Sequence, residues 1–124
     1  MRAEDHLAAA RRIEASLRRC EPDDHEMRIE GAMLAGSHRL NALLHRSAIT
    51  PDETDLMHSY LLTVNEFDRL SLAEPAAMAA LREIEKLRPA WVRGNHPGGR
   101  AAGTRAVELL ASIQARCAAQ EAGQ

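Results

Sequence analysis

Apolar residues recur along this chain every three to four positions, which is the spacing of one face of an α-helix. Alternation with a period of two is absent, and β-branched residues are sparse, so no sheet is expected. The recurrence predicts about five helical segments, over residues 3–20, 23–46, 50–67, 72–89 and 101–119. Short connections between the first four segments favour antiparallel neighbours. The predicted fold is therefore all-α, a four-helix up-and-down bundle with one additional or broken helix, in a single domain spanning residues 1–124.

Capping residues support these boundaries. Asp23 is followed three residues later by Glu26, the spacing of a capping box at a helix N-terminus. Thr50, Pro51 and Glu53 form the clearest predicted start, because proline is favoured at the first helical position. Ser71 is expected to begin the fourth helix, and the glycine-rich residues 94–99 to form a loop before the last one.

The helix predicted over residues 23–46 has two faces that look inward, and one of them is largely polar. Its apolar stripe contains Ile29, Met33, Leu40 and Leu44. The second stripe contains Met27, Glu30, Leu34, His38, Asn41 and His45. A helix that only covered a core would be apolar in both stripes, so this pattern predicts a binding groove or a subunit interface. Polar side chains bonded to neighbouring helices are the alternative explanation.

Composition and charge narrow the class of protein. The chain has 124 residues, is 45% hydrophobic and contains one Phe, one Tyr and one Trp, so Leu, Ile, Met and Ala must form the core. A net charge of −2 gives no general reason to expect nucleic acid or a membrane surface as a partner. The charge is uneven, however: residues 47–85 carry eight acids and two bases, whereas residues 86–107 carry five bases and no acid.

Several remaining features point to an ordinary cytoplasmic protein. Fifteen of the sixteen basic residues are arginines, a usage typical of a GC-rich bacterial genome. Cys20 and Cys117 have no metal-binding or redox spacing and are predicted to be buried free thiols. No signal peptide, membrane span or lipidation motif is recognisable, so a soluble location without membrane contact is expected.

Two further groups of residues have features of ligand sites. Asp55 and His58 have the i, i+3 spacing of a metal pair, but on the predicted helix 50–67 they would point to solvent. No metal site and no cofactor is therefore predicted. The loop residues Arg93, Asn95, His96 and Arg100 are a candidate anion site, with a flexible basic connection as the alternative.

One family resemblance falls on the second predicted helix. The segment Arg39-Leu-Asn-Ala-Leu-Leu-His45 resembles the Arg-x(4–6)-His motif of HEPN-type domains. These domains are small helical bundles, often dimeric, and some are metal-independent RNases in which Arg and His residues of two subunits meet. The resemblance implies a bundle fold and assigns Arg39 and His45 as the catalytic pair.

Two classes of function follow from the sequence. The first is a binding or oligomerisation module without catalysis, a homodimer or a partner of another protein, which uses the polar face of residues 23–46. The alternative is an HEPN-like RNase or another histidine-based enzyme, with His45 acting beside Arg39 or Arg93 and RNA as the substrate.

Overall fold

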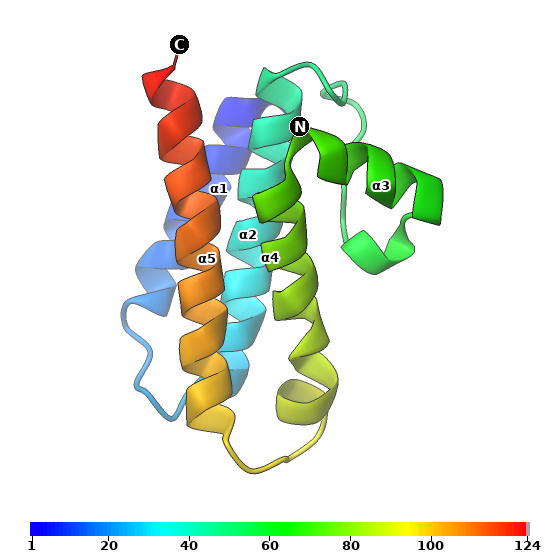
Figure 1. The fold of residues 1–124 in the computed structure, drawn as a ribbon. Helices are drawn as coiled ribbons and strands as arrows, with labels where there is room; N and C mark the ends of the chain where they lie inside the picture. The colour runs from blue at the N-terminus through cyan, green and yellow to red at the C-terminus, as the bar shows by residue number, and fades with distance from the viewer. Residues whose placement is uncertain (124) are drawn as a thin grey trace.

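Helices and helical turns account for about three quarters of the described residues (Figure 1). The computed structural model describes residues 1–123, and within them no strand is present. The α-helices are α1 (Ala3–Leu17), α2 (His25–Arg46), α3 (Val64–Ala73), α4 (Pro75–Lys86) and α5 (Gly99–Ala122). A 3-10 turn, η1 (Ser59–Leu61), precedes α3, and a π-helical turn, η2 (Pro89–Arg93), follows α4. The all-α, bundle-like prediction is confirmed.

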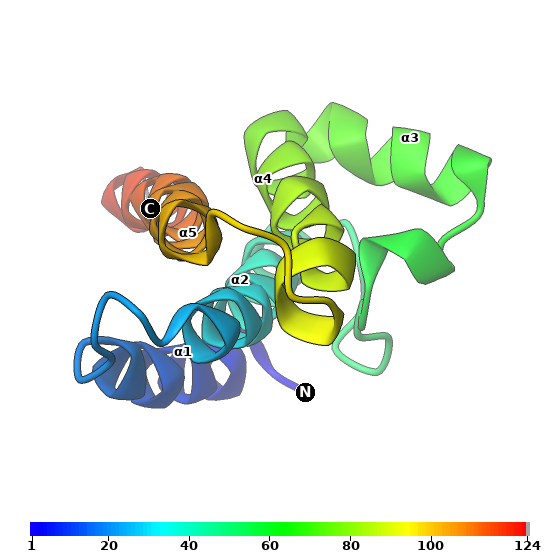
Figure 2. The same ribbon diagram turned by 90° about the horizontal axis from the view of Figure 1, so that it is seen from below.

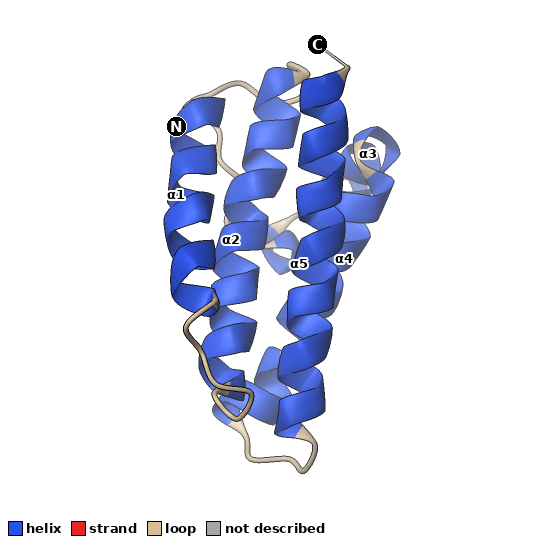
Figure 3. Cartoon of the chain, turned by 90° about the vertical axis from the view of Figure 1, so that its left-hand side faces the viewer, coloured by secondary structure: helices blue, strands red, loops and turns tan. Residues whose placement is uncertain are grey.

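Helix α2 lies at the centre of the bundle. It packs against α1 on one side and α5 on the other, and α4 closes the bundle against α2 and α5 (Figure 2). Figure 3 shows α1, α2 and α5 running side by side. The largest fully buried side chains come mostly from α2 and α4, with one from α5: Ile29, Leu40, Leu43, Leu44, Met78, Leu81, Ile84 and Ile113.

Small residues allow the helices to approach closely. Ala10 of α1, Ala32 and Ala35 of α2, and Ala106 of α5 are completely buried. At Gly36 a Cβ atom would lie 3.2 Å from Cδ1 of Ile113, so the absence of a side chain at Gly36 lets α5 pack closely against α2. A core built from Leu, Ile, Met and Ala with few aromatics thus packs through short side chains, as the composition predicted.

The prediction of a helix over residues 50–67 is wrong. Residues 51–58 form an extended loop and α3 begins only at Val64, after a capping box in which Thr63 and Glu66 bond each other's backbone N–H at 3.2 Å. The hydroxyl of Thr50 bonds the ring of His45 instead of capping a helix. The Thr50 hydroxyl is therefore engaged by the end of α2, and the helix begins instead at the capping box of Thr63 and Glu66.

Other boundaries differ by a few residues. Helix α1 ends at Leu17 instead of Cys20, and Ser71 lies inside α3, so α4 begins at Pro75. The predicted cap at Asp23 is also wrong, because Asp24 precedes α2 and its carboxylate accepts from the backbone N–H of Glu21 at 2.8 Å. Both cysteines are free thiols; Cys117 is buried and Cys20 only half-buried.

Helix α3 projects from the bundle (Figures 1 and 2). Leu70 is its one buried residue and connects it to the bundle beside α4, whereas Val64 and Leu72 are largely exposed. Among residues 1–123, no helix is long and apolar enough to cross a membrane.

Candidate functional site

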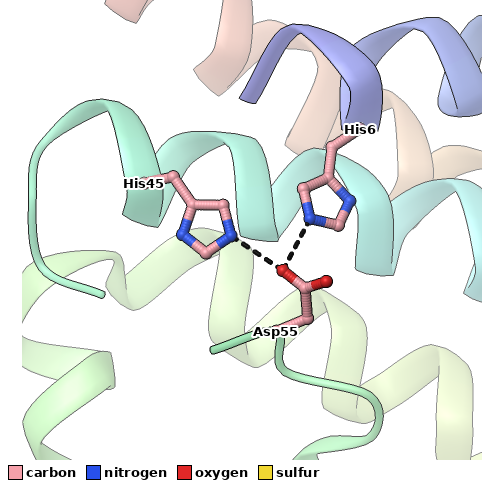
Figure 4. A group of neighbouring side chains, drawn as sticks. All are labelled: His6, His45 and Asp55. Atoms are coloured by element: carbon pink, nitrogen blue, oxygen red, sulfur yellow. Dashed lines mark hydrogen bonds and ion pairs between the residues drawn. The ribbon is translucent and has the colours of Figure 1, made fainter. Parts of the chain in front are cut away.

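Two histidines and an aspartate from three separate segments meet at one end of the bundle (Figure 4). His6 comes from the end of the first turn of α1, His45 from the last turn of α2, and Asp55 from the loop that follows. Oδ1 of Asp55 lies 2.8 Å from Nε2 of His6 and 2.9 Å from Nε2 of His45. The imidazoles are 3% and 0% exposed, whereas the Asp55 side chain is 31% exposed. The cluster is therefore enclosed by helices on the histidine side and open on the Asp55 side.

A second ring of contacts fixes both imidazoles. Nδ1 of His6 lies 2.9 Å from Nδ1 of His38, and Nδ1 of His45 lies 2.9 Å from the hydroxyl of Thr50 and 3.2 Å from its carbonyl oxygen. When neutral His6 donates its Nε2–H to Asp55, its Nδ1 accepts a hydrogen bond from His38. Each ring is thus oriented through both nitrogens before any ligand arrives.

The Asp55 carboxyl group is held in its ionised form. Desolvation by itself would raise its pKa, but hydrogen bonds from His45, His6 and the amino group of Met1 outweigh that effect and lower the pKa to about 2. The Met1 nitrogen lies 3.2 Å from Oδ2 of Asp55. A permanently charged carboxylate beside two imidazole nitrogens is a donor set suited to a metal cation.

The spacing of the three ligand atoms also suits one ion. One ligand atom each from His6, His45 and Asp55 lies within 4.8 Å of the others. Adjacent ligands of an octahedral ion with bonds of about 2.1 Å are separated by about 3.0 Å, and those of a tetrahedral ion by about 3.4 Å. The observed N–O distances of 2.8 and 2.9 Å are close to the octahedral value and need only a small expansion for the tetrahedral one.

The loop that carries Asp55 is positioned by the side chain of Asn41. Its amide nitrogen donates to the carbonyl oxygen of Leu56 at 2.8 Å and to that of Ser37 at 2.9 Å. Its amide oxygen accepts from the backbone N–H of Leu56 at 2.7 Å. The buried side chain of Asn41 therefore supplies hydrogen-bond partners for the backbone of this loop, next to Asp55.

The six residues of the predicted polar stripe lie in three different environments. His38, Asn41 and His45 are buried or half-buried and belong to the cluster and its supports. Glu30 accepts from Arg88 at 2.5 Å. Met27 and Leu34 are 64% and 47% exposed on the surface of α2.

Asp55 and His58 do not face solvent from a helix, which corrects that part of the sequence prediction. The extended loop brings Asp55 to the histidines and directs Nδ1 of His58 to the buried carboxylate of Glu85, 3.2 Å away. His6 was not among the predicted site residues. Its place on the apolar stripe of the first helix was the signal that could have found it, because a buried histidine needs a polar partner.

The pair assigned by the HEPN resemblance is divided between two clusters. Nε and Nη2 of Arg39 donate to the Glu14 carboxylate at 2.5 and 2.8 Å, whereas His45 bonds Asp55 and Thr50. In the candidate anion loop, Arg93, Asn95 and His96 are exposed, and Arg100 lies 3.1 Å from Asp23.

Comparisons with family models, with curated proteins and with solved structures gave no match for this chain. A functional assignment therefore rests on the geometry of its own residues.

Proposed function

We propose that this protein binds a divalent transition-metal ion through His6, His45 and Asp55. The observation that carries the proposal is the convergence of two buried Nε2 atoms on one ionised carboxylate oxygen, at 2.8 and 2.9 Å. Two histidines and one carboxylate are the ligand set of open catalytic zinc sites and of non-haem iron(II) sites.

The surroundings of the cluster support the same reading. Metal-bound histidines usually donate their second ring N–H to a carbonyl or another acceptor, which fixes the ring. The carbonyl oxygen of Thr50 is placed for this role at His45, and Nδ1 of His38 for the same role at His6. Three protein ligands leave coordination positions for water on the Asp55 side, once the Met1 amino group that bonds Oδ2 of Asp55 moves aside. An ion bound there would lower the pKa of that water and act as a Lewis acid.

The proposal predicts stoichiometric metal binding that depends on these three side chains. Purified protein stripped with a chelator should bind one Co²⁺ per chain, read from visible absorption, and zinc and iron should be sought by elemental analysis of freshly purified protein. His45→Gln and Asp55→Asn should each weaken binding by about tenfold to a hundredfold or more, because each removes a ligand.

His96→Gln is the matched control, since His96 is an exposed histidine in the loop before α5. Equal Co²⁺ affinity in all the variants, or no binding by the wild type, would refute the metal proposal. The His45→Gln variant also tests the HEPN-like alternative. Cleavage of single-stranded RNA that persists in EDTA and is lost in this variant would favour an RNase.

The exposed part of α2 supports an interaction role as the second candidate function. Met27 and Leu34 are two turns apart on one side of the helix, and both are largely exposed although apolar. We propose that this side of α2 is the subunit interface of a homodimer.

Leu34→Asp should convert such a dimer into a monomer, because a desolvated carboxylate would lie in the interface. Light scattering at matched concentrations measures the change. Leu72→Asp, at a leucine that is 86% exposed on α3, should leave the dimer intact. A wild-type monomer over the whole concentration range would contradict the proposal.

A further inference from the structure

An open groove lies on the far side of α4 from α5, in the angle made with α3. Its cavity volume is about 680 Å³, and it is bounded by η1, α3, α4 and η2. The apolar part of its lining is formed by Leu62, Val64, Phe67 and Pro89. A volume of this size is within the range of small-molecule sites in proteins.

Three exposed cations surround this apolar lining. Arg82, Lys86 and Arg93 all border the groove, and none of them forms an ion pair with another side chain of residues 1–123. The guanidinium of Arg82 lies 4.9 Å from the ring centroid of Phe67, so it stands directly over the apolar lining. The groove therefore combines a hydrocarbon-like surface with several positive charges that lack a partner.

Among residues 1–123, the two acids of the lining, Glu85 and Asp68, form no ion pair with these three cations. The Glu85 carboxylate is buried and already accepts from the backbone N–H and hydroxyl of Ser59 and from Nδ1 of His58. Asp68 is exposed and lies on α3. The fourth cation of the lining, Arg88, is engaged by Glu30.

We propose that this groove binds a free amphiphilic anion, a carboxylate attached to a short hydrocarbon chain. The chain would cover Leu62, Val64 and Phe67, and the carboxylate would lie among the ammonium of Lys86 and the guanidinium groups of Arg82 and Arg93. Burial of the chain supplies a non-directional driving force, and the cations select the sign of the charge. The groove shares no residue with the His6–His45–Asp55 cluster, so this inference is independent of the metal proposal.

Calorimetric titration with three probes tests both parts of the recognition. Decanoate should bind saturably with one site per chain. Decyltrimethylammonium has the same chain with the opposite charge, and acetate has the charge without the chain; neither should bind measurably. Lys86→Gln and Arg93→Gln should each weaken decanoate binding about fivefold, the effect of one exposed ion pair.

Two further variants separate a groove effect from a general charge or folding effect. Arg11→Gln removes an exposed arginine of α1, outside the groove, and should leave decanoate affinity unchanged. Val64→Glu adds a negative charge in the groove at the first position of α3, where an acid is compatible with the helix, and should abolish binding. Equal affinity for the two ten-carbon probes, no effect of Lys86→Gln and Arg93→Gln, or a dimer that buries the groove and excludes decanoate would each overturn the proposal.

Discussion

Arg39→Met is expected to lower the free energy of unfolding by about 3 to 5 kcal/mol, the largest effect of any substitution considered. The Arg39 and Glu14 side chains are only 12% and 7% exposed, and two hydrogen bonds join them. Removing the guanidinium leaves the Glu14 carboxylate buried without a cation. Chemical denaturation followed by circular dichroism measures the loss.

Arg46→Met is the matched control for this experiment. Arg46 forms an ion pair with Glu121 at 3.2 Å, but the two side chains are more exposed, so the expected loss is below about 1 kcal/mol. The double variant Glu14→Leu with Arg39→Met should recover most of the stability, because no charge then stays buried. Equal losses in Arg39→Met and Arg46→Met would contradict the buried pair.

The Glu14–Arg39 pair also predicts how the stability of the protein changes with pH. Burial would raise the pKa of Glu14, but hydrogen bonds from Arg39 and Gln114 outweigh burial and hold the pKa below its ordinary value of 4.5. The unfolded chain therefore takes up this proton first, and the stabilisation present above pH 4.5 is lost as the pH falls below that value. Glu14→Gln should be less stable than wild type at pH 7 and should lose less on acidification.

Leu40→Ala is expected to cost about 2 to 5 kcal/mol of unfolding free energy. Leu40 is 0% exposed at the centre of α2, the helix that contacts α1, α4 and α5, so the deletion leaves a cavity that several helices would have to move to fill. Leu72→Ala removes the same atoms from a leucine of α3 that is 86% exposed, and should change stability by less than about 0.5 kcal/mol. Similar losses at both positions would contradict the central place of α2.

Local signals in the sequence predicted the parts of the fold that local interactions determine. The apolar stripe of Ile29, Met33, Leu40 and Leu44 is buried along α2, and that helix is central. Three residues of the polar stripe, His38, Asn41 and His45, make specific contacts within the protein, which agrees with the alternative explanation of that stripe; a groove or interface along it stays a prediction.

The candidate metal centre could not be assembled from the sequence, because His6 lies 49 residues from Asp55 along the chain and the segment that carries Asp55 was predicted to be helical. Thr50 and Pro51 have the local pattern of a helix start, but the Thr50 hydroxyl bonds the His45 ring and Asn41 holds the backbone of Leu56 in the loop that follows. With the helix misplaced, Asp55 was assigned to the wrong side of the molecule. The place of His6 on the apolar stripe of the first helix indicates a buried side chain that needs a polar partner, but nothing in the sequence identifies that partner as Asp55.

The side-chain amide of Asn41 holds the loop that carries Asp55, and this limits how the sequence of the loop can vary. Asn41 binds the backbone of Leu56, and residues 51–54, which precede this contact, are exposed. The identity of these residues can change, but the number of residues between the end of α2 and Leu56 cannot, because that number determines which side chain lies beside His6 and His45. We expect an insertion there to leave the bundle folded but to place a neighbouring residue, instead of Asp55, beside the two histidines.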